Sequence, residues 1–147
     1  MADCCSSDGP TRPRARQHRC PVNGIEYRSL QAKTVLHHVK QAWQWSDADQ
    51  AFYFCEDPLC RVVYFTDDDT VLLQSHLRTT VGIKSCADDA PACYCFGVTR
   101  NDLRNDPAIE AFIIGQTRRR ACSCETSNPS GRCCLGDFRR ARGQRNP

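Results

Sequence analysis

Cysteine is the residue type through which this chain could do chemistry. The 147 residues include twelve cysteines, a density typical of a disulfide scaffold or of a metal-thiolate protein. Residues 1–13 contain no apolar stretch of the kind found in a secretory signal. We therefore expect a cytoplasmic protein whose thiols stay reduced and bind metal. The cysteines form these groups: Cys4 and Cys5, Cys20, Cys55 and Cys60, Cys86, Cys93 and Cys95, Cys122 and Cys124, Cys133 and Cys134.

Six cysteines follow residue 90, enough to supply the four thiolates, two on each iron, that a 2Fe-2S cluster needs. Cys93 and Cys95 form one pair, and we expect them at the start of a helix, where the positive helix end stabilises anionic sulfur. The second pair comes from positions 122, 124, 133 and 134. Adjacent side chains in an extended chain point in opposite directions, so only one of the cysteines at 133 and 134 is a ligand. The alternatives are a four-thiolate zinc site, whose usual C-x2-C spacing is missing, and buried or pairing thiols.

The earlier cysteines suggest a zinc ribbon, in which a C-P-x-C knuckle faces a second pair carried by a hairpin. Cys20, Cys55 and Cys60 supply three ligands, but Asn23 stands where the knuckle would have its second cysteine. The fourth ligand is left open between His37 or His38, one of the first two cysteines, and water. Hydrogen bonds in place of a metal are the remaining possibility.

Four sequence motifs, in order, resemble the N-terminal domain of the CopZ copper chaperones: FYFC-x4-C-x-VVYF, LRTTVGIK, CYCFGVT and C-x3-NPSGRCC. CYCFGVT is also similar to the C-x-C-N-G-V-T opening of bacterioferritin-associated ferredoxins. The resemblance covers residues 19–138 and implies both a 2Fe-2S cluster and a zinc ion. It implies cluster ligands at Cys93, Cys95, Cys124 and one of the adjacent pair, of which we favour Cys134. Cys122 has no counterpart in the family.

These motifs predict an α+β fold: a small antiparallel zinc-ribbon-like sheet with one helix, followed by a short helical cluster-binding region. We expect a flexible tail over 1–18, the zinc-ribbon-like part over 19–90, the cluster-binding part over 91–138 and a basic tail over 139–147. Ser29 is expected to cap a helix running to residue 43. Alternating and β-branched runs predict strands at 51–55, 61–65, 70–73 and 76–83.

Helix signals return after CYCFG. Thr99 and Asp102 resemble a capping box, and Asp106 followed by Pro107 is a common helix start. We therefore expect two helices there, and then a turn at NPSG that leads into a short helix or coil.

The formal charge of +3 hides arginine-rich stretches at 12–19, 118–120 and 139–145. No aromatic residues interleave with these arginines, so we do not expect nucleic acid as a partner. No segment is apolar for long enough to cross a bilayer.

The motifs predict a redox or metallochaperone-type protein of copper or other soft-metal handling. The chain lacks the M-x-C-x-x-C loop of a copper-carrying domain, so we expect it to donate electrons for metal reduction. Its partners would be a soft-metal ion, a redox donor protein, and a copper transporter or chaperone. No catalytic constellation favours a turnover enzyme. The alternative is a zinc-only module whose basic tails contact nucleic acid or a partner protein.

Overall fold

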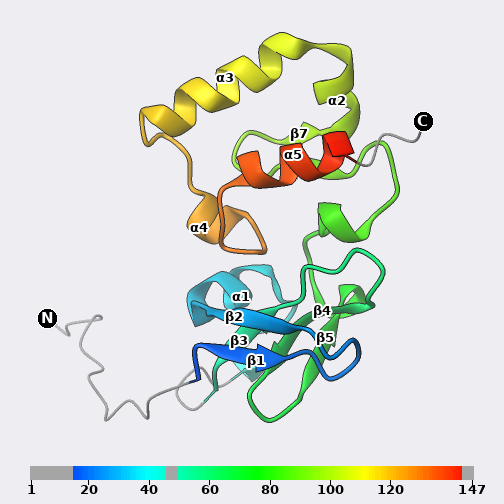
Figure 1. Cartoon of the computed structure of the whole chain (residues 1–147). Helices are drawn as coiled ribbons and strands as arrows, with labels where there is room; N and C mark the ends of the chain where they lie inside the picture. The colour runs from blue at the N-terminus through cyan, green and yellow to red at the C-terminus, as the bar shows by residue number, and fades with distance from the viewer. Residues whose placement is uncertain (1–14, 46–49, 144–147) are drawn as a thin grey trace, which may run out of the picture.

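The computed structural model describes residues 15–45 and 50–143, with side chains as far as residue 138. A five-stranded sheet with helix α1 forms one part of the molecule, and helices α2 to α5 gather beside it as a second part (Figure 1). This α+β arrangement agrees with the expectation from sequence. None of the described helices is long and apolar enough to cross a membrane.

The sheet is an antiparallel meander in the order β1-β2-β3-β4-β5. Its strands are β1 (Gln17–Arg19), β2 (Glu26–Leu30), β3 (Phe52–Phe54), β4 (Val62–Thr66) and β5 (Val71–Leu73). The predicted hairpin of residues 51–55 and 61–65 is confirmed, because β3 pairs with β4. β3 and β4 are buried along their whole length, so the sheet contributes to a core on each face.

Period-two alternation sorts the side chains of β3 between the two cores. Phe52 and Phe54 pack with helix α1, whereas Tyr53 packs with Cys20, Cys55 and Cys60 on the other face. In β4 a register shift between Val62 and Tyr64 interrupts the alternation. The small sheet therefore separates an apolar core from a core that contains three cysteines.

Helix α1 (Ala32–His38) is shorter than predicted. Ser29 belongs to β2, where it pairs with Tyr53, so it is not the helix cap. After His38 the chain turns away, and Trp43 in the short 3-10 helix η1 (Ala42–Gln44) is exposed rather than part of the core.

The strand predicted at 76–83 is wrong. Two 3-10 helices, η2 (Gln74–His76) and η3 (Gly82–Lys84), flank an irregular segment there. The Gln74 side chain bonds the carbonyl oxygen of Thr79 and the N–H of Val81, which removes backbone groups that a sheet would use.

The second part begins with a hairpin of β6 (Pro91–Cys93) and β7 (Val98–Thr99). It continues with α2 (Arg100–Asn105), α3 (Pro107–Arg118), α4 (Cys124–Ser127) and α5 (Cys134–Gly143). The capping box at Thr99 and the cap at Asp106 are both confirmed. Cys93 and Cys95 lie at the end of β6 and in the hairpin turn, so the helix predicted to begin at them starts only at Arg100.

Regular secondary structure extends into both segments that were expected to be tails. β1 starts at Gln17, inside the region expected to be flexible, because it pairs with β2. Helix α5 continues to Gly143, past residue 138. The remainder of the two expected tails, 1–14 and 144–147, lies outside the described residues.

Three of the hydrogen bonds that join the two parts of the molecule come from α1 and β4. The Thr34 hydroxyl donates to the carbonyl oxygen of Glu125 at 2.6 Å, and His38 Nε2 lies 2.6 Å from that of Thr126. The Tyr64 hydroxyl donates to the carbonyl oxygen of Pro129. The segment that follows Cys124 is therefore anchored on α1 and β4.

Candidate metal centres

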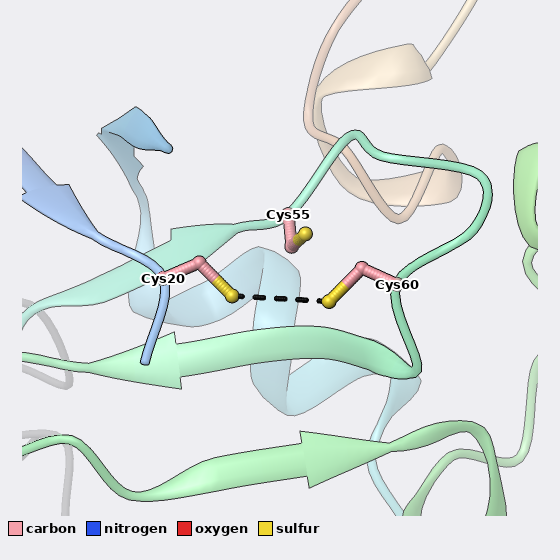
Figure 2. Close-up of side chains that lie close together, drawn as sticks. All are labelled: Cys20, Cys55 and Cys60. Carbon is pink, nitrogen blue, oxygen red and sulfur yellow. Dashed lines mark hydrogen bonds between the residues drawn. The ribbon is translucent and has the colours of Figure 1, made fainter. Parts of the chain in front are cut away.

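Cys20, Cys55 and Cys60 bring three sulfur atoms within 4.8 Å of one another, and all three residues are buried. Figure 2 shows the side chains of Cys20 and Cys60 pointing toward each other, with Cys55 beside them. The Cys20 and Cys60 sulfurs are 3.9 Å apart. A tetrahedral zinc with Zn–S bonds of about 2.3 Å has a sulfur–sulfur edge of ~3.8 Å, so this trio fits three corners of a zinc site.

Two tight turns position these cysteines. The N–H of Gly24 donates to the carbonyl oxygen of Cys20 at 2.9 Å, and Gly24 adopts a positive φ of 73° that glycine tolerates. In the hairpin the Asp57 carboxylate accepts from the N–H of Leu59 at 2.9 Å, which fixes the turn before Cys60. The sulfurs converge because β1, β3 and β4 are neighbours or near neighbours in one sheet.

No fourth His, Cys, Asp or Glu among the described residues joins this trio. His37 is exposed, and buried His38 lies 2.7 Å from the Thr79 hydroxyl and 2.6 Å from the carbonyl oxygen of Thr126. The proposed ligand at Cys4 or Cys5 lies outside the described residues. Asn23 approaches Cys55 instead, with its amide nitrogen 3.4 Å from the sulfur.

The surroundings of the trio make one thiol easier to ionise and another harder to ionise. Burial opposes ionisation of Cys55, but the N–H of Asp57, the Lys84 ammonium and the Tyr27 hydroxyl outweigh it, so the pKa of Cys55 is lowered. Burial and the neighbouring Cys55 raise the pKa of Cys60 to about 11. Sequence reasoning missed Tyr27 and Lys84, because no motif links them to the cysteines.

The four cysteines predicted to hold the cluster also meet in space. Cys93 ends β6, Cys95 lies in the hairpin turn, and Cys124 and Cys134 are the first residues of α4 and α5. Cys95 and Cys124 have sulfurs 3.5 Å apart, and those of Cys124 and Cys134 are 3.8 Å apart. The Cys134 thiol also hydrogen-bonds Cys93, so the sulfurs form a chain in the order 93, 134, 124, 95.

Burial separates these four residues from the other nearby cysteines. Cys93, Cys124 and Cys134 are buried around Ile113 and Phe138, and Cys95 is partly exposed. Cys133 is exposed, whereas its neighbour Cys134 is buried. Cys86 is exposed and Cys122 is partly buried beside Cys124.

Hydrogen bonds within the four-sulfur group favour the thiolate form of Cys93 and Cys124 and raise the pKa of Cys134. The hydrogen bonds that link Cys134 to its two neighbours lower the pKa of Cys124 to about 5 and that of Cys93 to about 7. The N–H of Ser123 donates to the Cys95 sulfur at 3.2 Å, although burial raises the pKa of Cys95 to about 11. Cys124 and Cys134 lie at helix starts, as had been expected of Cys93 and Cys95.

The turn between Cys124 and Cys134 fixes their spacing. Buried Asn128 accepts from the N–H and hydroxyl of Ser130, and Gly131 adopts a φ of 71°. This NPSG turn reverses the chain so that α5 brings Cys134 back to Cys124.

Three comparisons with known proteins agree with one another. A family model described as "Zinc binding domain" matches residues 17–78. The copper chaperone CopZ of Archaeoglobus fulgidus is 37% identical over 123 residues, which is 79% of this chain and 57% of that protein. The X-ray structure of the CopZ N-terminal domain from the same organism has a TM-score of 0.68 and 36% identity, and the match covers 85% of this chain and 98% of that one. The chain thus spans little more than half the length of the full-length relative.

Proposed function

Since the chain belongs to the family of CopZ N-terminal domains, we propose that it is a metal-thiolate protein of copper handling that donates electrons for metal reduction. Zinc is held by Cys20, Cys55 and Cys60. A 2Fe-2S cluster is held by Cys93, Cys95, Cys124 and Cys134. Because thiolate ligands must stay reduced, the proposed location is the cytoplasm.

One observation carries the cluster proposal: four cysteine sulfurs from two hairpin positions and two helix starts form a connected chain around a buried core. A 2Fe-2S cluster needs four thiolates, and buried surroundings with N–H donors to sulfur are the means by which proteins tune it. The residues present therefore fit this group.

The spread of these sulfurs favours a cluster over a single zinc ion. In a mononuclear tetrahedral site all four sulfurs lie about 3.8 Å from one another. Among the described residues, a trio of sulfurs within 4.8 Å of one another is found only at Cys20, Cys55 and Cys60. The sulfurs of the four proposed cluster ligands are more extended, as a cluster with two iron ions requires.

When bound, the cluster supplies one-electron transfer. The substrate of the proposed reaction is Cu(II), which gains one electron to become Cu(I), and a separate redox protein restores the electron. Cys95 is the most exposed of the four ligands, so the edge of the site at Cys95 faces the partners. Exposed arginines at 118–120 precede Cys122 and favour the reduced, more negative state.

Anaerobically purified protein tests this proposal. Iron and acid-labile sulfide are expected at two each per chain, with an EPR signal on one-electron reduction. The reduced protein is then mixed with Cu(II) and a Cu(I) chelator in a stopped-flow instrument. Cluster colour returning together with the chelator signal supports electron donation. A reduced protein that stays reduced over minutes, or a Cys93→Ala variant that reacts equally fast through free thiols, rules it out.

The alternative function is a zinc-only module that contacts nucleic acid or a protein through its basic tails. The zinc-binding family match favours it, and the exposed arginines at 118–120 add positive charge outside the tails. Purified protein that contains zinc but is colourless would support this alternative. Binding to nucleic acid would then weaken steeply with added salt.

A further inference from the structure

Asn23 is oriented as a hydrogen-bond donor to the three-thiolate site. Its side-chain oxygen accepts from the N–H of Ile25 at 2.9 Å, within the knuckle turn. Its NH₂ group therefore points toward the Cys55 sulfur at 3.4 Å, with the Tyr27 hydroxyl at 3.2 Å. An amide NH₂ offers hydrogens and no lone pair to a metal, so Asn23 supports a thiolate without acting as a ligand.

The other residues considered as a fourth ligand are already engaged in hydrogen bonds. One carboxylate oxygen of Asp57 accepts from the N–H of Leu59, and the other lies 3.3 Å from the Asn23 nitrogen. His38 forms hydrogen bonds with the Thr79 hydroxyl and the carbonyl oxygen of Thr126. In residues 15–45 and 50–143 the trio thus has three sulfur donors and no fourth protein ligand.

We propose that this trio binds Cu(I) as a three-coordinate thiolate site and that Cu(I) replaces zinc there, an inference that rests on the proposed role in copper handling. Thiolates select Cu(I) by softness, whereas structural zinc sites almost always have four ligands. Zinc bound here needs an outside fourth ligand such as water, and Cu(I) does not.

The exchange conserves oxidation state. Cu(I) arrives already reduced, in a chelate or thiolate complex, and zinc leaves as Zn(II) with its water. The three sulfurs remain thiolates throughout, and any thiol still protonated loses its proton to solvent. Lys84, whose ammonium donates to the carbonyl oxygens of Asp57 and Cys60 at 2.7 and 3.1 Å, places a positive charge beside the resulting anionic site.

Asn23 is the positioning residue that sets this preference. Asn23→Cys adds a fourth thiolate and is expected to convert the trio into a conventional zinc site. Asn23→Ala removes the N–H donor without adding a ligand and is expected to weaken Cu(I) binding about tenfold, as loss of an outer-shell partner does. The two variants separate the effect of ligand number from that of hydrogen bonding.

The experiment loads the full chain with zinc and titrates it anaerobically with Cu(I) supplied as a chelate. Metal analysis measures the exchange, and X-ray absorption at the copper and zinc edges measures coordination number. In the original chain one Cu(I) with three sulfur neighbours is expected to displace one zinc. In Asn23→Cys the zinc is expected to remain, with four sulfur neighbours. Circular dichroism confirms that each variant is folded.

Two results overturn the proposal: zinc that stays four-coordinate in the original chain at excess Cu(I), and Cu(I) binding that is lost in a Cys4→Ser, Cys5→Ser double variant. The cluster is read separately, by its visible absorption in the same samples. Three-coordinate Cu(I) in colourless protein would support this inference and contradict the proposed cluster. A coloured protein that does not exchange zinc would contradict this inference and support the proposed cluster.

Discussion

Arg132 forms an ion pair with Glu56 that joins the two candidate metal centres. Glu56 follows Cys55 in the hairpin turn, and Arg132 lies between Cys124 and Cys134. Each partner therefore belongs to a loop that positions cysteines of a different centre. The Glu56 side chain is 19% exposed and that of Arg132 is 50% exposed, so solvent screens the pair only in part.

We predict that Arg132→Gln and Glu56→Gln each lower the free energy of unfolding, with a coupling energy of about 0.5 kcal/mol for the pair. The measurement is urea unfolding of both single variants and the double variant, since the cycle removes the other contacts of each side chain. In 1 M salt, where the screening length is about 3 Å, the coupling is expected to shrink. A coupling of zero at low salt would show that the two loops are held together by other contacts.

The hydrogen bond of His38 links the two parts of the molecule, and we predict that this link is acid-sensitive. The carbonyl oxygen of Thr126 only accepts, so Nε2 carries the hydrogen and Nδ1 accepts from Thr79. Burial is the main cause that lowers the pKa of His38 to about 4. The unfolded chain has an ordinary histidine pKa of about 6.5 and binds the proton more readily, so protonation favours unfolding.

The stabilising contribution of neutral His38 is therefore complete above pH 6.5 and decreases as the pH falls toward 4. The pKa difference corresponds to a loss on the order of 3 kcal/mol over that range. His38→Gln retains a donor and an acceptor but does not titrate, and urea unfolding at several pH values should show a shallower slope for it. His37→Gln, at the exposed neighbouring position, is the control and should keep the original slope.

The parts of the fold that depend on neighbours in sequence could be predicted. The 51–65 hairpin follows from two apolar runs around Asp57 and Pro58, and the caps at Thr99 and Asp106 are local signals. Residues 76–83 were predicted wrongly because the Gln74 side chain and a bridge between Val39 and Leu77 determine their conformation. The first is a local side-chain contact and the second is a tertiary contact, and strand propensity reports neither.

For the candidate sites too, short-range features could be predicted from the sequence and long-range features could not. Cysteine spacing indicates Cys20, Cys55 and Cys60, because a knuckle and a hairpin turn are both short-range structures. The orientation of Asn23 depends on Ile25 and Cys55 together, so it becomes clear only when the strands are assembled. The distinction between Cys133 and Cys134 depends on how the start of α5 packs, because Cys134 begins the helix and is buried, whereas Cys133 precedes it and is exposed.

Replacement of single cysteines tests the proposed cluster ligands. Alanine at Cys93, Cys95, Cys124 or Cys134 is expected to abolish the visible absorption and the bound iron and sulfide, since one iron would lose a thiolate. Cys133→Ala is the matched control, because Cys133 is adjacent to Cys134 but exposed. Cys86→Ala and Cys122→Ala are also expected to retain the colour. Loss of colour in Cys133→Ala with retention in Cys134→Ala would contradict the assignment.

Gly82 lies at a close contact between the two parts of the molecule. A Cβ added at Gly82 would lie 1.9 Å from the carbonyl oxygen of Pro91, so the backbone would have to move. The N–H of Gly82 donates to the Tyr94 hydroxyl at 2.7 Å, and its carbonyl oxygen accepts from Arg100. Gly82→Ala is therefore expected to lower the free energy of unfolding by about 1–3 kcal/mol, the usual range for forced overpacking.

The effect of Gly82→Ala should also reach the cluster. Tyr94 lies between Cys93 and Cys95, so displacement of its hydroxyl partner is expected to reduce bound iron per chain as well as stability. Gly115→Ala is the control, because a Cβ there meets nothing within 4 Å in α3 and should stabilise the helix by about 0.5–1 kcal/mol. Urea unfolding and iron analysis of both variants measure the two effects. If Gly82→Ala matches the original chain in both, the close contact between η3 and β6 does not hold the cluster hairpin in place.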